Sequence, residues 1–156
     1  MAELTRFHVV HIIATSPNKG VVLRGVDLSD INLARLSLAE ANLAYANLAK
    51  ANLATADLTR ANLISATLAY ADLSEATLHG AQLRNAILTG ADLRAVDLTD
   101  ADLREADLRG ANLRGADLAR ANLWHANLTD ANLMYANIEG AKGLPVDIDQ
   151  RLQYSA

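Results

Sequence analysis

Hydrophobic residues recur at every fifth position of this chain, from residue 21 to residue 140, without a break. Divided into five-residue units, this stretch has Leu at the third position of every unit except the last, which has Ile138. The first position is a larger aliphatic residue in the first four units and Ala in the next twenty, apart from Val96. The second position is mostly Asp or Asn, and the fourth and fifth positions vary. A single structural unit is therefore repeated 24 times over 120 residues.

This period excludes the two regular elements that a long repeat could form. An α-helix needs apolar residues about every 3.6 positions, so leucines five residues apart would spread around the whole helix. In a strand the side chains alternate between faces, so an odd period would point successive leucines to opposite sides. A chain that turns once per unit brings every Leu and every Ala to one interior and leaves the other positions in water. The sequence therefore predicts a solenoid.

The units resemble those of the pentapeptide-repeat family, whose pattern is A(D/N)LXX. Residues 41–45 read ANLAY and residues 71–75 read ADLSE, and units of this kind cover about three quarters of the chain. The resemblance implies an all-β fold, a right-handed quadrilateral β-helix with four units in each 20-residue coil. Six such coils, spaced about 4.8 Å apart, make a rod roughly 29 Å long.

We expect one domain with three parts: an N-terminal cap over residues 1–20, the solenoid over 21–140 and a C-terminal cap over 141–156. The caps are needed because the open end of a solenoid is a sheet edge. The apolar run at residues 9–14 can cover the first coil as a strand, which its β-branched residues favour, or as a helix, which its length also allows. At the other end Pro145 stops the pairing, and residues 147–154 can form helical turns with Ile148 and Leu152 on one side.

The composition excludes several classes of function. The formal net charge is −4 and the charged fraction is an ordinary 21%, which argues against a general nucleic-acid binder. There is no cysteine, so disulfides, thiolate catalysis and cysteine metal sites are excluded. The run at residues 9–14 is too short to span a bilayer, and His11 within it argues against a signal peptide. The resemblance suggests a bacterial protein; we expect it in the cytoplasm, with a lumenal or periplasmic location left open, and without membrane contact.

Residues 20 apart stack in such a coil, and this register places a belt of arginines in the fourth and fifth coils. Arg84 and Arg104 share one column, Arg94 and Arg114 share the column two faces away, and Arg109 lies on the face between. In one interpretation these side chains splay apart and pair with nearby acidic residues, namely Asp92, Asp102, Asp107 and Glu105. In the other, the belt is the contact surface for a protein partner.

Three large apolar residues fall in the last coil: Trp124, Met134 and Tyr135. Trp, Tyr and Met are enriched at protein interfaces, so a homodimer contact is one explanation. The other is that the C-terminal segment folds back over them. The sequence leaves both open.

No group of residues has the makings of a catalytic, cofactor or metal site. His79 and His125 fall on different faces and coils, and His8 and His11 lack a third ligand. His79 lies between two threonines of its column, but a convex rod offers no concavity from which water is excluded. We therefore expect a protein without enzymatic activity and without a cofactor.

The favoured function is a stiff scaffold that presents side chains at fixed spacings to a protein partner. The alternative is modulation of DNA gyrase or another topoisomerase by mimicry of duplex DNA, which the resemblance to the quinolone-resistance members of the family implies. Against mimicry, the rod has 10 basic residues to offset its 15 acidic ones, and it lacks the core Phe residues and inserted loops frequent in those members. Direct nucleic-acid binding is not expected.

Overall fold

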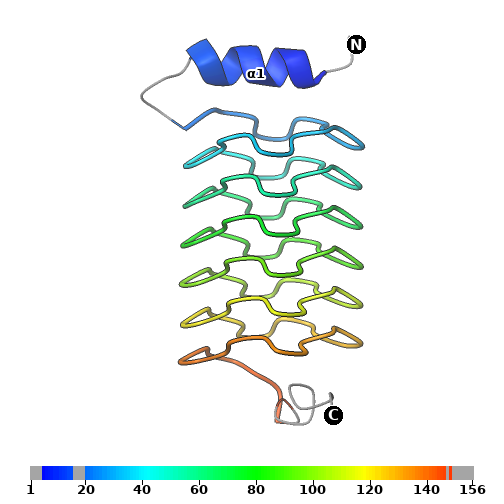
Figure 1. Cartoon of the computed structure of the whole chain (residues 1–156), viewed down its shortest axis with the longest axis vertical. Coiled ribbons are helices and arrows are strands. Elements are labelled where there is room, and N and C mark those ends of the chain that lie inside the picture. Colours follow the sequence, from blue (N-terminus) through cyan, green and yellow to red (C-terminus); the bar gives the residue numbers. More distant parts are fainter. Residues whose placement is uncertain (1–4, 16–19, 147, 149–156) are drawn as a thin grey trace.

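The coils of the chain are held together by residues that lie 20 positions apart. The computed structural model describes residues 5–15, 20–146 and 148. In it, the residue at the second position of each unit forms an isolated parallel bridge with its counterpart in the next coil. The bridges run from Val22–Asn42 to Asn122–Lys142. Four units thus complete one coil, and the coils stack into the β-solenoid that the period predicts (Figure 1).

Every backbone N–H of a typical unit has a hydrogen-bond acceptor. The third and fifth positions donate to the next coil, the second donates to the previous coil, and the first closes a turn on the unit before. The fourth donates to the side chain of its own second position. The bonds of the unit 61–65 are Ala61 N to Leu58 O (2.9 Å), Asn62 N to Ala41 O (2.9 Å), Leu63 N to Gln82 O (2.8 Å), Ile64 N to Asn62 Oδ1 (3.1 Å) and Ser65 N to Arg84 O (2.9 Å).

The preference for Asp and Asn at the second position follows from this pattern. All 18 Asp and Asn residues at that position accept the N–H two residues further along the chain. Such Asx turns are the reason these residue types are common at bends. The choice of Asp or Asn at the second position therefore serves mainly the fold. Because these carboxylates already accept a backbone N–H, they are less available to a partner.

Each unit ends in a tight turn formed by its fourth and fifth positions. The fifth residue has a positive φ in all 24 units, from 52° at Ala95 to 68° at Gly140, and 18 of the 24 are not glycine. A positive φ at this point of a turn, as in type II turns, normally favours Gly or Asn. The bond from the fifth N–H to the next coil holds the other residue types in this conformation.

The first and third positions fill a narrow core. The third-position Leu residues from Leu23 to Leu123 are at most 2% exposed, and each Ala at the first position from Ala41 to Ala121 is at most 1% exposed. No polar or charged side chain is buried among the described residues. The small Ala opposite each Leu is a steric requirement, because a second large side chain would overpack the interior.

The helix α1 (Arg6–Thr15) lies across the open end of the first coil (Figure 1). The sequence left helix and strand open; at the start of the helix the Thr5 N–H donates to the His8 Nδ1 at 3.2 Å, in the manner of a capping box. Val9 is completely buried against the coil, and Ile12 and Ile13 are half-buried beside it. The helix thus covers the open end of the first coil, where the residues at the first position of each unit are larger than Ala.

At the other end the core becomes progressively exposed, because no further coil follows. Ala126, Ala131 and Ile138 are only partly buried. The pairing stops at Lys142, and Leu144 and Ile148 pack against the partly exposed core. The helical turns expected over residues 147–154, with Leu152, lie outside the described residues except for Ile148 itself. Among the described residues, no helix combines the length and apolar character needed to cross a membrane.

Candidate interaction surfaces

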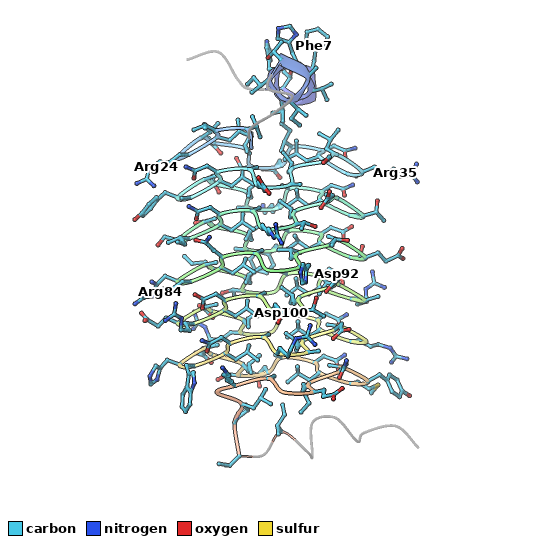
Figure 2. The ribbon with its side chains drawn as sticks, turned by 90° about the vertical axis from the view of Figure 1, so that its left-hand side faces the viewer. Phe7, Arg24, Arg35, Arg84, Asp92 and Asp100 are labelled. Atoms are coloured by element: carbon cyan, nitrogen blue, oxygen red, sulfur yellow. The ribbon has the colours of Figure 1, made fainter. Side chains whose placement is uncertain are left out.

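The arginine belt, meaning Arg84, Arg94, Arg104, Arg109 and Arg114, occupies three sides of the rod. Figure 2 places Arg84 on the same side as Arg24 and opposite Arg35. Arg104 lies one coil beyond Arg84 in the same column, and the register puts Arg94 and Arg114 on the side of Arg35. The belt is therefore not a single face, and one flat partner cannot contact all five guanidinium groups.

Four of the five belt arginines form ion pairs with the acidic residues that the sequence suggests as partners. The pairs are Arg84–Glu105 (2.9 Å), Arg94–Asp92 (2.6 Å), Arg104–Asp102 (2.6 Å) and Arg109–Asp107 (2.7 Å). In three of them the acid is at the second position and the arginine at the fourth position of one unit. The same Asx turn that satisfies the arginine N–H therefore also brings the two charges together.

The paired carboxylates are stabilised in their charged form. The hydrogen bond from the Arg109 side chain lowers the pKa of Asp107 to about 2, and the corresponding bonds lower the pKa of Asp92 and Asp102. The arginines of these pairs are exposed, so water screens the charges and the pairs contribute little to stability. Most of the belt is consequently neutralised locally.

Arg114 differs from the other four because its unit has Asn112 at the second position. Its guanidinium lies 4.9 Å from the centre of the Tyr135 ring and 3.1 Å from the Met134 sulfur. No ion pair involves Arg114 in the part of the chain that the structure describes. It is the belt arginine whose charge is most available to a partner.

The three apolar residues of the last coil are not brought together. Trp124 continues the column of Arg84, whereas Met134 and Tyr135 lie on the side of Arg35, across the rod in Figure 2. Trp124 and Tyr135 are 54% and 57% exposed, while Met134 is half-buried. A lateral contact can use one side or the other, and only an end-to-end contact between two rods can engage both.

The chain after residue 140 covers part of this end. Gly143 lies so close to the backbone of Trp124 that a Cβ there would clash with it. A pocket of about 290 Å³ remains beside it, lined by His125, Ala126, Asn127, Leu128, Thr129, Gly143 and Pro145. The lining offers one titratable side chain and no carboxylate, which is not the donor set of a hydrolytic or metal site.

His79 belongs to a network of polar side chains that links neighbouring coils. Its Nδ1 lies 2.8 Å from the Thr99 hydroxyl, which donates to Asp97, and 3.9 Å from Asp100, which Arg120 binds through two bonds of 2.8 Å. The network is exposed on a convex surface, and one nitrogen of His79, Nδ1, faces both Thr99 and Asp100, whereas a catalytic triad uses the two ring nitrogens separately. It ties the coils together and has no features of a catalytic triad. No group of three or more His, Cys, Asp or Glu residues suited to a metal occurs in the described chain.

The sequence analysis missed a side of the rod on which the exposed Tyr70 and Ile87 lie. Tyr70 projects from the third coil and Ile87 from the fourth, and the register puts both on the side that runs from the turn at Arg84 to the turn at Tyr70 and Gly90. Counting charges over the whole rod conceals this side. Sorting the large apolar residues by the 20-residue register would have revealed it.

The family model for pentapeptide repeats matches the chain in eight copies, over residues 19–59, 41–80, 56–94, 78–115 and 111–142. The chain belongs to the pentapeptide-repeat family. Among curated proteins no sequence matches it.

Solved structures of other pentapeptide-repeat proteins are similar to it. HetL, involved in heterocyst differentiation regulation in Nostoc sp. strain PCC 7120, is 26% identical over 90% of this chain and 93% of HetL, with a TM-score of 0.41. A protein from the Arabidopsis thaliana thylakoid lumen is 28% identical over 82% of this chain and 73% of its own, with a TM-score of 0.40. Trypsin-treated QnrB1, a plasmid-mediated fluoroquinolone resistance protein, is 17% identical over 90% of this chain and 68% of its own, with a TM-score of 0.50. The likeness to QnrB1 concerns the fold alone.

Proposed function

We propose that this pentapeptide-repeat protein is a non-enzymatic scaffold that presents a rigid array of side chains to a protein partner. The observation that carries the proposal is the unbroken core from Leu23 to Leu133, with every charged side chain outside it. Each outward column is spaced by the coil repeat of about 4.8 Å, so a partner meets side chains at fixed intervals. Fixed side chains lose little entropy on binding, which favours recognition by a rigid surface.

Within this scaffold, the part of the arginine belt around Arg114 is the partner surface that the geometry supports best. The other belt arginines already have carboxylate partners, and a protein partner would have to displace those bonds. Arg114 is held above Tyr135 by a cation–π contact, so a charge and an aromatic ring are presented together. Arg and Tyr are among the residues that contribute most to binding at interfaces. An acidic partner surface with an apolar centre fits this pair.

The experiment is affinity capture from the source organism with the wild type and with Arg114→Glu. A partner that binds the wild type and is lost from Arg114→Glu supports the proposal. Arg35→Glu, on the same side but at the other end of the rod, is the matched control and should retain the partner. Equal capture by all three proteins would contradict the role of Arg114.

DNA mimicry directed at gyrase is the alternative, and one column of carboxylates is the feature that favours it. Asp57, Asp97 and Asp117 belong to one column of residues on one side of the rod. However, each is engaged in an Asx turn, and Arg120 lies beside them, paired with Asp100. A row of phosphates carries no such counter-charges. We therefore expect no inhibition of gyrase supercoiling at any molar ratio; inhibition abolished by changing the three aspartates to Asn would favour mimicry.

The remaining expectations belong to the same proposal. Four turns in each coil support the quadrilateral cross-section. We infer the right-handed winding from the family resemblance, and the cap boundaries at residues 20 and 141 from where the five-residue pattern begins and ends. A bacterial cytoplasmic location is proposed on the same ground. A homodimer through the last coil stays a prediction, which the Trp124 variant described below tests.

A further inference from the structure

The fold leaves the choice between Asp and Asn at the second position of each unit free. Both side chains accept the N–H that closes the Asx turn, as Asn62 and Asp72 do. What distinguishes them is a negative charge at the surface. The distribution of Asp and Asn around the rod is therefore a property of the surface and not of the core.

In the second, third and fourth coils, residues 41–100, this choice follows the sides of the rod. Two adjacent sides, formed by residues 41–50, 61–70 and 81–90, have a neutral residue at every second position and contain no Asp or Glu at all. We call them together the acid-free surface. The other two sides contain every acidic residue of these coils, namely Asp57, Asp72, Glu75, Asp92, Asp97 and Asp100.

The acid-free surface is positively charged. Lys50 and Arg84 lie on it, and Arg84 is shared with Glu105 of the next coil. Arg24 lies one coil above, with its guanidinium 4.4 Å from the centre of the Tyr45 ring. In the described part of the chain, neither Lys50 nor Arg24 takes part in an ion pair. Both charges are therefore available to a partner.

The acidic residues around this surface are compensated on one side and limit it on the other. In the fifth coil, the same two sides of the rod contain three acids, each paired with an arginine: Asp102, Glu105 and Asp107. In the first coil, Asp27 and Asp30 lie above the second of the two sides. The surface therefore ends at the first coil on that side.

Exposed apolar side chains lie on the acid-free surface. Tyr45, Tyr70 and Ile87 are 54%, 65% and 42% exposed, whereas no large hydrophobic residue is exposed on the other two sides of these three coils. Ile87 occupies a second position, where it cannot accept the N–H that Asp or Asn would bind. It therefore gives up a local interaction and exposes a branched apolar side chain. Residues that break a local rule without a gain in the fold are expected where a protein binds something.

The two tyrosines are held in place by the protein's own contacts. The ring of Tyr70 lies against Gly90, where an added Cβ would come within 2.6 Å of the Tyr70 Cε1. The ring of Tyr45 lies under the guanidinium of Arg24. Rings that are already immobilised lose little entropy when a partner covers them.

We propose that the acid-free surface docks an acidic segment of another protein. The carboxylates of the segment meet Lys50 and Arg24, and its apolar residues cover Tyr70 and Ile87. Charge complementarity selects this occupant, because the acid-free surface attracts a negative segment and the six acids of the opposite sides repel it. Such a division of charge steers the partner to one half of the rod.

The surface is large enough for a specific contact. The chain exposes 8127 Å² over 156 residues, so the 30 residues of the acid-free surface expose roughly 1,500 Å², about twice what one partner contributes to a standard interface. Its two sides meet at a corner, the turns at residues 44–45, 64–65 and 84–85. A segment that wraps this corner needs to cover only half of the surface. The contact is independent of the one proposed at Arg114, which lies on another side in the fifth coil.

Fluorescence polarisation with a labelled peptide probe tests the proposal. The probe is a short peptide rich in Glu with two Phe residues, and a matched probe has Lys in place of Glu. Every protein in the series carries Arg114→Glu, so that Arg114 and Tyr135 cannot account for binding, and the protein with this change alone is the reference. The surface variant adds Lys50→Glu with Ile87→Asn.

A second variant is the matched control on the opposite half of the rod. It adds Arg60→Glu with Thr77→Asn to the reference, which are the same two kinds of change. Both variants should fold, because Glu already occupies the fifth position with a positive φ at residues 40, 75 and 105, and Asn is common at the second position. Unchanged circular dichroism spectra check this.

The reference should bind the Glu-rich peptide at least about tenfold more tightly than the surface variant, which lacks one charge contact and one apolar contact. The matched control should bind it as the reference does. Binding should weaken as the salt rises from about 50 to about 300 mM, because exposed charges are screened. The Lys-rich peptide should bind the surface variant no more weakly than the reference.

Three outcomes overturn the proposal. The first is a reference that does not bind the Glu-rich peptide at concentrations up to about 1 mM. The second is equal binding by the reference and the surface variant, or an equal loss in the surface variant and the matched control. The third is self-association of the reference in sedimentation velocity that the surface variant lacks, which would make a second copy the occupant. None of these results bears on the role of Arg114, which is replaced throughout the series.

Discussion

Replacing Leu73 with Ala should cost about 3–5 kcal/mol, the upper part of the range for buried leucines. Leu73 is completely buried in the middle of the rod, with Leu53 and Leu93 in the adjacent coils of its column. The cost of such a change rises with the cavity that survives relaxation. Here the neighbours cannot close the space, because the Leu53 N–H bonds Asp72 O at 2.7 Å and the Leu73 N–H bonds Asp92 O at 2.8 Å. The backbone is thus fixed on both sides of the lost side chain.

The same unit contains its own controls. Ala71→Leu should cost roughly 1–3 kcal/mol by overpacking, because Ala71 is 1% exposed. Ser74→Leu, on the outside, should change the free energy of unfolding by less than about 0.5 kcal/mol. Leu73→Lys should prevent folding, since it would bury a charge without a partner.

Urea denaturation measures these differences, with circular dichroism and Trp124 fluorescence as two probes. Coincident transitions would justify a two-state treatment, which a repeat protein does not guarantee. A cost below about 1 kcal/mol for Leu73→Ala, or a larger cost for Ser74→Leu than for Leu73→Ala, would refute the inward packing of the third position.

Three further predictions concern the surface of the rod. Because the pKa of Asp107 is lowered to about 2, its ion pair stabilises the fold at pH values above the unfolded pKa of about 3.9, and this stabilisation is lost as the pH falls toward 2. In Asp107→Asn, the free energy of unfolding in urea should therefore fall less between pH 4 and pH 2 than in the wild type. An unchanged acid profile would contradict the pairing. Asn62→Ala should lower the free energy of unfolding by about 0.5–1.5 kcal/mol, because it removes the acceptor of an Asx turn; no measurable change would show that water replaces the side chain fully. If the last coil forms a homodimer contact, Trp124→Ala with Tyr135→Ser should convert a dimer to a monomer in sedimentation without unfolding it; a wild type that is monomeric at high micromolar concentration would contradict that contact.

The core and the register could be predicted from the sequence because one period controls both. Every Leu and Ala assigned to the interior by its position in the unit is buried, except near the two ends, where Leu36, Ala126, Ala131 and Ala136 are half-buried. Three of the four ion pairs of the belt also follow from the unit itself, since an acid two positions before an arginine is brought beside it by the turn; the fourth, Arg84–Glu105, joins adjacent coils. Features that repeat are predictable because each unit has the same surroundings.

The features that escaped prediction are those without a repeat. The helix α1 depends on the contact between Thr5 and His8 and on the shape of the first coil, neither of which the β-branched composition of residues 9–14 conveys. The grouping of Tyr70 and Ile87 was missed because residues 17 positions apart in sequence become neighbours only once the coil length is applied.

The stacking of residues 20 positions apart underlies every assignment of a side chain to a side of the rod, and engineered cysteines test it directly. The chain has no cysteine of its own, so Ala49→Cys with Ala69→Cys creates one defined pair in adjacent coils. Their expected spacing of about 4.8 Å lies within the Cα separations that a disulfide bridges. Under mild oxidation this pair should form an intramolecular disulfide rapidly in the folded protein. Pairs of Ala49→Cys with Ala34→Cys or Ser74→Cys, 15 and 25 positions apart, should form one only after unfolding. Equally fast cross-linking of all three pairs, or faster cross-linking at a separation of 15 or 25, would contradict the 20-residue coil.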